Sequence, residues 1–65
     1  MKLFEVPRNT LFKLLENTEG PPGSRKPNKN EEYWFSHLDG MYSLCYDNNN
    51  KVVHIPGWVS VEVLK

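Results

Sequence analysis

The sequence predicts an all-β domain, and three features of its second half support this prediction. Between Glu31 and Leu64, apolar and polar residues alternate with a period of two, which is typical of strands with one buried face. Asp39-Gly40 interrupts the alternation once, and the asparagine run 48–50 interrupts it again. Both are residue types that tolerate the backbone of tight turns, so we expect consecutive strands to pair as an antiparallel meander.

The length of the chain limits how much core it can form. Its 65 residues, Met1 to Lys65, are enough for a single small domain. Domains of this size usually depend on a disulfide, a metal or self-association, and the single cysteine, Cys45, excludes an internal disulfide. We therefore expect the aromatic residues, or assembly into a homo-oligomer, to supply the missing stability.

Charge and hydropathy argue against several classes of protein. Eight basic and eight acidic residues cancel, which argues against a main affinity for phosphates. No apolar run approaches the roughly 18 residues of a membrane span, and the N-terminus lacks the apolar segment of a secretory signal. An unpaired cysteine is typical of a reducing compartment. We expect a cytoplasmic protein without membrane contact.

The first sixteen residues are less regular. Residues 1–9 alternate weakly and contain Pro7, so we expect an edge strand or an extended lead-in. Residues 10–16 fit either a strand or one or two helical turns, because the leucines of LFKLLE share a helical face. We favour the strand, because so short a helix is marginal in water and the sheet needs a further strand to close.

Residues 17–30, NTEGPPGSRKPNKN, predict a long exposed loop. They hold three of the five prolines and two of the four glycines, and no apolar residue anchors them. The loop also carries Arg25, Lys26 and Lys29, the basic cluster of the chain. It is either simply solvated or a segment that contacts a partner.

The two turns predict which residues face the core. Two-residue loops at Asp39-Gly40 and Asn49-Asn50 give a register in which apolar residues face one another. Trp34 and Leu38 then share the outer face, because alternate residues of a strand point to the same side. The expected inner face consists of Tyr33, Phe35, Leu44, Tyr46, Val53 and Ile55.

Over residues 10–64, a first strand, a long polar loop, a three-stranded meander and a short final strand follow one another. In HIPGWVSVEVL the chain breaks at Pro56-Gly57 and restarts at Trp58. This order resembles SH3-like small barrels, in which a 3₁₀ turn leads from the fourth strand to the fifth. The resemblance implies an SH3-like barrel of about five antiparallel strands with a long first loop. Proline-peptide recognition is not implied, because the first strand reads LFKLLE in place of an ALYDY-like motif and the loop is basic.

The stretch FSHLDGMYSLCYDNNNKVVHI, in a small chain that begins with its own Met, resembles small uncharacterised accessory proteins of tailed bacteriophages. This resemblance implies a viral protein that works in the cytoplasm of a bacterial host by binding and modulating a host protein. It carries over no functional residues.

Two groups of residues were considered for catalysis or metal binding. Cys45 and His54 are expected as cross-strand neighbours, which would suit an activated nucleophile or half of a zinc site. A structural zinc needs four ligands, however, and His37 is expected on the opposite face. Asp39 lies close to His37, but the turn itself explains an aspartate there. We expect no enzyme activity, no metal and no cofactor.

The favoured function follows from the residues that remain once the inner face is filled. Trp34, Leu38, Met41 and Trp58 would form an apolar patch, and such patches on small proteins usually mark contact surfaces. We therefore expect a small non-enzymatic protein-binding module. Its partner would be another protein, such as a bacterial host protein, or a second copy of the chain.

Two alternatives remain open. Arg25, Lys26 and Lys29, close to Tyr33 and Trp34, would suit a single-stranded nucleic-acid-binding barrel that combines phosphate contacts with base stacking. The zero net charge argues against this alternative. A structural component of a viral particle is the other alternative, although the chain has no repeat or heptad that would support it.

Overall fold

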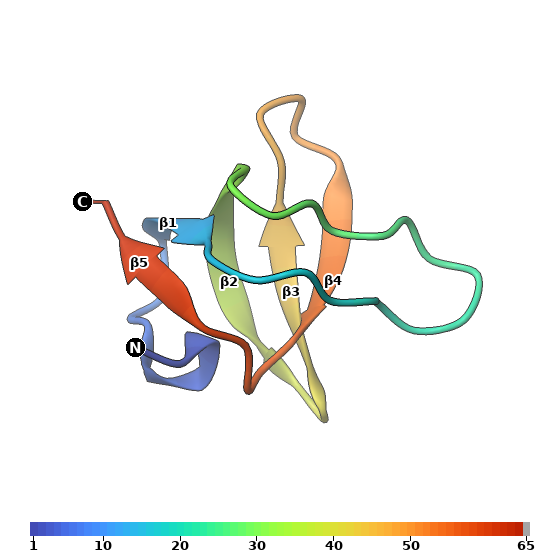
Figure 1. Cartoon of the computed structure of the whole chain (residues 1–65), viewed down its shortest axis with the longest axis horizontal. Helices are drawn as coiled ribbons and strands as arrows, with labels where there is room; N and C mark the ends of the chain where they lie inside the picture. Colours follow the sequence, from blue (N-terminus) through green and yellow to red (C-terminus); the bar gives the residue numbers. More distant parts are fainter. Residues whose placement is uncertain (65) are drawn as a thin grey trace.

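The computed structural model describes residues 1–64, and it is an all-β protein with a single sheet of five antiparallel strands (Figure 1). The order of the strands across the sheet is β4-β3-β2-β1-β5, so the first strand pairs with both the second and the last. The predicted all-β class and antiparallel meander are confirmed. The strands are β1 (Thr10–Leu14), β2 (Glu32–Asp39), β3 (Tyr42–Tyr46), β4 (Val52–Pro56) and β5 (Val61–Val63).

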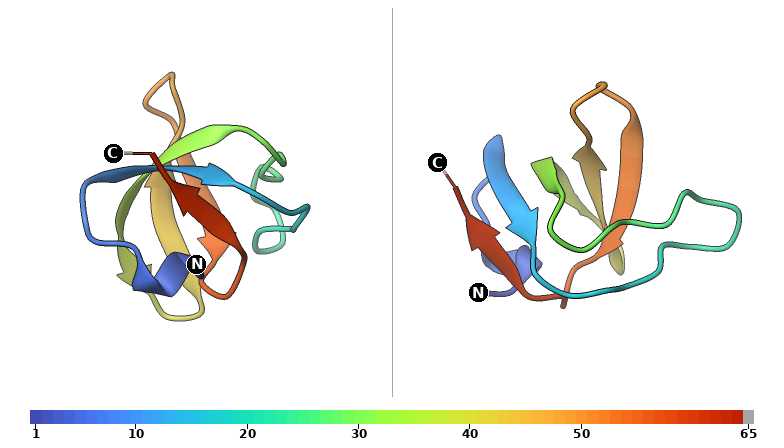
Figure 2. Two further views of the ribbon diagram at one scale, coloured as in Figure 1. Left: turned by 60° about the vertical axis from the view of Figure 1, so that its left-hand side comes forward. Right: turned by 45° about the horizontal axis from the view of Figure 1, so that its top comes forward.

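The sheet curls but does not close, so the expectation of a closed barrel is wrong. β4 and β5 are its two edges, and they lie on opposite sides of the curl (Figure 2). β5 begins only at Val61, later than the expected restart at Trp58. The segment before it pairs with the N-terminus instead: the Leu3 N–H donates to the Val59 carbonyl (3.0 Å) and the Phe4 N–H to the Gly57 carbonyl (2.8 Å). These hydrogen bonds attach the N-terminus to the segment between β4 and β5.

The N-terminal residues 1–9 form neither the expected edge strand nor an extended lead-in. Leu3–Glu5 is a 3₁₀ turn, η1, and the Lys2 N–H donates to its Glu5 carboxylate (2.8 Å). Leu3 is fully buried beneath the turn, whereas Phe4 points outward. No helix within residues 1–64 is long and apolar enough to cross a membrane.

The core occupies the concave side of the curled sheet. Phe12 of β1 and Tyr33 of β2 lie at its centre, with ring centroids 6.0 Å apart. The Tyr33 hydroxyl reaches the long loop, where it accepts a hydrogen bond from the Asn28 N–H and donates one to Glu31 (both 3.0 Å). The buried apolar residues are Leu3, Val6, Phe12, Leu14, Tyr33, Phe35, Cys45, Val53, Ile55, Val59 and Val61.

The first turn of the meander lies one residue beyond its expected position, and the second is longer than the expected two-residue loop. Asp39 is opposite Tyr42, so the first loop consists of Gly40 and Met41. Gly40 alone of these two has a positive φ (70°), the conformation that a turn with glycine in the first central position requires. Tyr46 is opposite Val52, so residues 47–51 form the second loop.

A β-bulge in β2 changes the faces of the strand. Phe35 is opposite Cys45 and His37 is opposite Leu44, so Ser36 is an extra residue between two paired positions. The bulge and the shifted turns together direct Cys45 into the core and leave Leu44 half-buried on the convex side. Tyr33, Phe35, Val53 and Ile55 are therefore inside as predicted, whereas the inward placement of Leu44 and Tyr46 is wrong.

Candidate functional site

The four apolar residues predicted to share one patch lie on two separate parts of the surface. All of them are exposed: Trp34 by 44%, Leu38 by 45%, Met41 by 67% and Trp58 by 52%. Trp34 is opposite Tyr46 on the convex face, whereas Leu38 is opposite Ser43, whose side chain points to the concave side. The bulge at Ser36 separates Trp34 from Leu38, because the extra residue reverses the alternation between them.

The first surface lies at the end of the β2–β3 hairpin, and we call it the hairpin-end cluster: Phe4, Leu38, Met41 and Trp58. Gly57 lies beside two of these side chains, because an added Cβ would come within 3.2 Å of Leu38 Cδ2 and 3.8 Å of Phe4 Cβ; the Met41 carbonyl oxygen lies 3.8 Å from the same point, and Trp58 is the next residue in the chain. The Gly57 N–H donates to the Met41 carbonyl (3.2 Å). Three segments distant in sequence therefore meet here: η1, the hairpin tip and the turn after β4.

The aromatic ring of Trp58 extends this cluster toward β3. Its centroid lies 6.5 Å from that of the half-buried Tyr42, with the ring planes inclined by 45°. Phe4, exposed by 54%, was missed by the sequence analysis. The weak alternation around Pro7 suggested a strand, and only the 3₁₀ turn directs Phe4 toward Leu38.

The second surface is the convex row, an apolar line across the outside of the sheet: Leu64, Leu11, Trp34, Tyr46 and Val52. Cross-strand pairing aligns Leu11 with Trp34, Trp34 with Tyr46, and Tyr46 with Val52. The Leu64 N–H donates to the Leu11 carbonyl (2.9 Å), which continues the row beyond β1. Tyr46 was expected inside, so this row was not foreseen from the sequence.

A charged row runs beside the convex row. Lys13 of β1 pairs in register with Glu32 of β2 on one side and with Glu62 of β5 on the other. Lys13 is half-buried and both glutamates are exposed. The convex face thus carries an apolar line next to an acidic-basic-acidic line.

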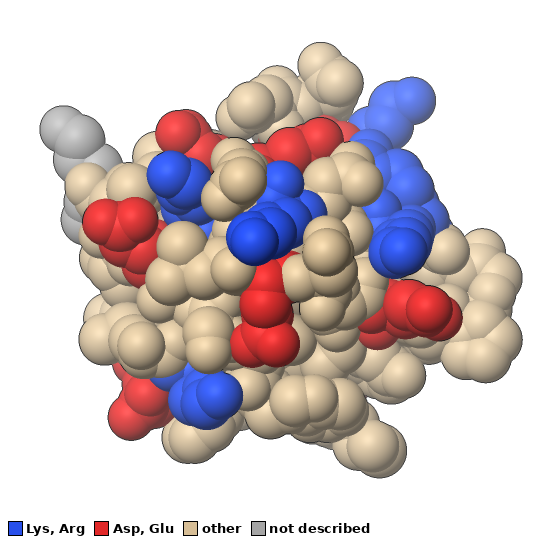
Figure 3. All heavy atoms as spheres, in the orientation of Figure 1, with Lys and Arg blue, Asp and Glu red and all other residues tan. Residues whose placement is uncertain are grey.

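The basic cluster of the long loop is only partly available for a partner. The Arg25 guanidinium hydrogen-bonds to Asp47, whose side chain is 6% exposed, and lies 3.9 Å from the Glu31 carboxylate. The hydrogen bond to Asp47 raises the pKa of Arg25. Lys26 and Lys29 are exposed. On the face shown in Figure 3, acidic side chains lie next to most of the basic ones, and basic side chains adjoin one another only at the upper right.

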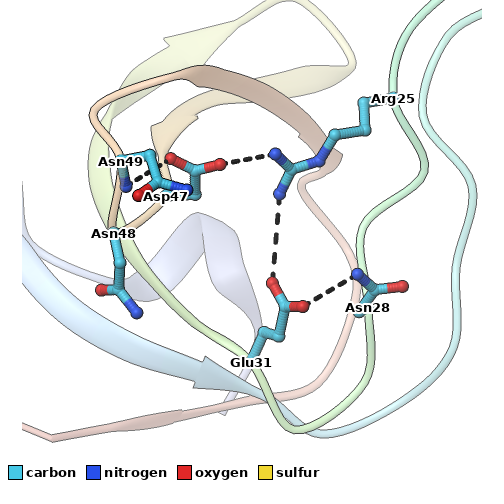
Figure 4. Close-up of a pocket in the computed structure, with 6 residues that line it drawn as sticks. All are labelled: Arg25, Asn28, Glu31, Asp47, Asn48 and Asn49. Carbon is cyan, nitrogen blue, oxygen red and sulfur yellow. Dashed lines mark hydrogen bonds and ion pairs between the residues drawn. The ribbon is translucent and has the colours of Figure 1, made fainter.

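A polar pocket of about 480 Å³ lies between the long loop and the β3–β4 turn (Figure 4). Asp47 organises it: one carboxylate oxygen accepts hydrogen bonds from the N–H groups of Asn49 (2.8 Å) and Lys51 (3.0 Å), and the other binds Arg25. These donors hold the pKa of Asp47 below its usual value, with the Lys51 N–H contributing most. The charged groups of the pocket are already paired with one another. We therefore interpret the pocket as a structural contact that holds the long loop against the β3–β4 turn.

The expected Cys45–His54 pair does not form. Cys45 is opposite Val53 on the concave side, whereas His54 is opposite Leu44 on the convex side. Burial raises the pKa of the Cys45 thiol to about 12, so it remains protonated at neutral pH. Nδ1 of the other histidine, His37, lies 2.9 Å from the hydroxyl of the neighbouring serine. Within residues 1–64, no group of three or more His, Cys, Asp or Glu side chains is placed to hold a metal ion.

Tyr33 was expected beside the basic loop as a stacking residue for a nucleic acid. Its side chain is instead fully buried, and only its hydroxyl contacts the loop. Trp34 is exposed, but its aligned neighbours are Leu11 and Tyr46 on the convex face. The stacking residues and the basic loop are therefore not combined as the nucleic-acid alternative requires.

No family model, no curated protein and no solved structure matches this chain. The functional interpretation therefore depends on the geometry of the two apolar surfaces, the charged row and the long loop.

Proposed function

We propose that the protein is a small non-enzymatic protein-binding module whose contact surface is the hairpin-end cluster. One observation carries this proposal: the exposed side chains of Leu38 and Phe4 both approach Gly57, and the exposed Met41 and Trp58 belong to the segments that meet there. Exposed apolar clusters on small proteins usually mark interaction sites, and Trp, Phe and Met are enriched at the centres of interfaces. The partner in this proposal is another protein, and the resemblance to phage accessory proteins implies a bacterial host protein.

The construction of the cluster supports this proposal. Backbone hydrogen bonds connect Phe4 to Gly57 (2.8 Å) and Gly57 to Met41 (3.2 Å), so the segments that present the side chains are held together before any partner binds. A preformed surface loses less conformational entropy on binding than a mobile one. The unbranched side chain of Met41 can adapt to the shape of the partner.

The order of the strands supports a further part of the proposal, that the domain has an SH3-like fold. The strand order β4-β3-β2-β1-β5 and the long loop between β1 and β2 agree with the order of elements in that class. In this view, the open edge between β4 and β5 is a departure from a closed barrel. The proposed contact surface does not depend on this assignment.

Crosslinking followed by a binding measurement tests the function. A photoreactive side chain introduced at Met41 is expected to capture a partner protein from nuclease-treated bacterial lysate. The same probe at Leu15, which is also exposed but lies outside the cluster, is expected to capture nothing specific. Calorimetry with the purified partner should then show at least about tenfold weaker binding for Leu38→Asp, and unchanged binding for Leu15→Asp.

Either of two results would contradict the proposal. In the first, Leu38→Asp and Leu15→Asp weaken the binding of the partner equally, while circular dichroism shows that both variants are folded. In the second, the Met41 probe captures a protein from untreated lysate but none from nuclease-treated lysate, which would favour the nucleic-acid alternative.

A further inference from the structure

The convex face of β1 and β2 carries a pattern that is complementary to itself. Leu11 pairs in register with Trp34, and two residues further along β1, Lys13 pairs with Glu32. Each strand therefore presents one apolar and one charged residue, and the charges on the two strands are opposite. Exchanging the two strands would bring apolar residues against apolar ones and a positive charge against a negative one.

Within residues 1–64, the charged residues of this pattern form no ion pair with one another. Lys13 has Glu32 and Glu62 in register on its two sides. Yet among residues 1–64, the ion pairs within 4.0 Å are both made by Arg25, with Asp47 and with Glu31. The ammonium of Lys13 and the carboxylate of Glu32 are thus available for groups outside the chain.

We propose that two copies of this chain pack convex face to convex face, around a twofold axis that runs along the strands between β1 and β2. Such an axis places β1 of one copy over β2 of the other. Leu11 then faces Trp34 of the second copy, Lys13 faces Glu32 of the second copy, and both contacts occur twice. This axis keeps the strands of the two copies nearly aligned, as is common when sheets pack face to face.

The charged residues favour this axis over a twofold axis along either β1 or β2. A twofold axis that ran along β1 itself would place Lys13 over Lys13 of the second copy, and one along β2 would oppose two Glu32 carboxylates. Like charges across an interface are unfavourable. The axis between the two strands places opposite charges against each other and apolar side chains against each other.

Several properties of the chain favour a second copy as the occupant of this face. The net charge is zero, so no long-range repulsion opposes association. A domain of 65 residues has a thin core, for which self-association is a common support. Trp34 is a large, exposed side chain near the centre of the proposed contact, as is typical of residues that dominate interface energies.

The shape of the sheet limits the strength of the dimer. A standard interface buries about 800 Å² per partner, which would be about a fifth of the 4097 Å² surface of this chain. Because both faces are convex, contact is confined to β1, β2 and the strands beside them (Figure 2). We therefore expect a weak, concentration-dependent dimer.

Charge reversal tests the proposal directly. In analytical ultracentrifugation, the wild-type mass should rise with concentration from 7.6 kDa toward twice that value. Lys13→Glu and Glu32→Lys each place like charges across the interface, so each variant alone should remain monomeric. Mixing the two variants should restore the dimer, because the substituted side chains then face each other, as do the remaining Lys13 and Glu32.

The mixing experiment separates contacts between copies from contacts within one chain. Mixing does not change the contact within each chain, where residues 13 and 32 still carry like charges in both variants. A dimer that forms only on mixing must therefore depend on a contact between two copies. Glu62→Lys is the matched control: it also places a like charge beside Lys13, but Glu62 does not face Lys13 of the second copy, so the dimer should persist. Circular dichroism verifies that each variant is folded.

Three outcomes would overturn the proposal. The wild type stays at 7.6 kDa at the highest soluble concentration; both charge reversals dimerise like the wild type; or the folded variants fail to associate on mixing. The inference does not rest on the proposed function, and Leu38→Asp distinguishes the two, because it should weaken partner binding at least about tenfold while leaving the dimer unchanged.

Discussion

The two faces of the sheet use similar residues on the same strands, yet only one of them holds the fold together. Phe12 and Tyr33 on the concave side are fully buried, whereas Leu11 and Trp34, their immediate neighbours in sequence, lie on the convex side. Trp34 is larger than Tyr33 and remains 44% exposed. The size and hydrophobicity of a side chain therefore do not decide its burial here. The position of the residue relative to the turns and the bulge decides it.

Each face also has one residue whose burial is unusual for its type. Ser43 is fully buried on the concave side, and its hydroxyl has no hydrogen-bond partner within the described residues. Trp34 is the corresponding exception on the convex side. Substitutions at matched positions on the two faces show how strongly the faces differ.

The largest difference is expected between Phe12 and Leu11. Phe12→Ala removes a fully buried ring from the core and should lower the free energy of unfolding by about 3–5 kcal/mol. Leu11→Ala, on the half-buried convex side, should cost less than about 1 kcal/mol in the monomer. Urea denaturation at low protein concentration measures both values. Equal losses would mean that the convex side is also part of the core.

The next effect concerns Asp47, a buried acid at the rim of the concave side. Its pKa is lowered in the folded state by the Lys51 N–H, by Arg25 and by the Asn49 N–H. The stability that it contributes is therefore complete above its unfolded pKa of about 3.9 and is lost as the pH falls through the lower, folded value. Asp47→Asn should be less stable than the wild type at neutral pH, and the two should converge in acid.

Urea denaturation midpoints recorded across this acidic range test the Asp47 prediction. Asp39→Asn, an exposed substitution at the first turn, is the control and should follow the wild-type profile. If the difference in midpoint between Asp47→Asn and the wild type does not shrink on acidification, the charge of Asp47 contributes nothing to the contact between the long loop and the β3–β4 turn.

A smaller effect, of opposite sign, is expected at Ser43. Ser43→Ala should raise the free energy of unfolding by about 1 kcal/mol, because an unpaired buried hydroxyl costs more than the small space it leaves. Ser36→Ala removes a hydroxyl that hydrogen-bonds to the His37 ring, so it should not stabilise the protein. Thermal melts of the two variants show whether burial without a partner is the cause.

The smallest effect is expected at Trp34. Trp34→Ala should change the stability of the monomer by less than about 1 kcal/mol, although it removes the largest kind of side chain. Denaturation below the concentration at which copies associate measures this value. A loss as large as that expected for Phe12→Ala would place Trp34 in the core and remove the convex row as a contact surface.

The sequence was sufficient to predict the all-β class and the strands of the meander, because the alternation from Glu31 onward is regular. It was not sufficient to predict the register. Gly40 suits either central position of a two-residue turn, so the choice between Asp39-Gly40 and Gly40-Met41 depends on tertiary contacts. At the second turn, Asp47 accepts two backbone hydrogen bonds and thereby lengthens the loop.

The candidate sites were predicted less well than the strands, for related reasons. Leu38, Met41 and Trp58 were correctly expected at the surface, and the segments that carry them meet at Gly57. Trp34 was assigned to the same patch because a bulge at an ordinary serine has no clear sequence signal. Nothing in the sequence indicated that Arg25 would be held by Asp47, since these residues are far apart in the chain.

The extra residue at Ser36 has a consequence for how many partners one molecule can hold. In an unbulged strand, Trp34 and Leu38 would lie on one face and compete for the same neighbour. With the bulge, the two apolar surfaces are separate, so a molecule that used both as proposed would have a valency of two. A dimer joined through the convex rows would display two hairpin-end clusters, and a partner with two matching sites would bind such a dimer with avidity.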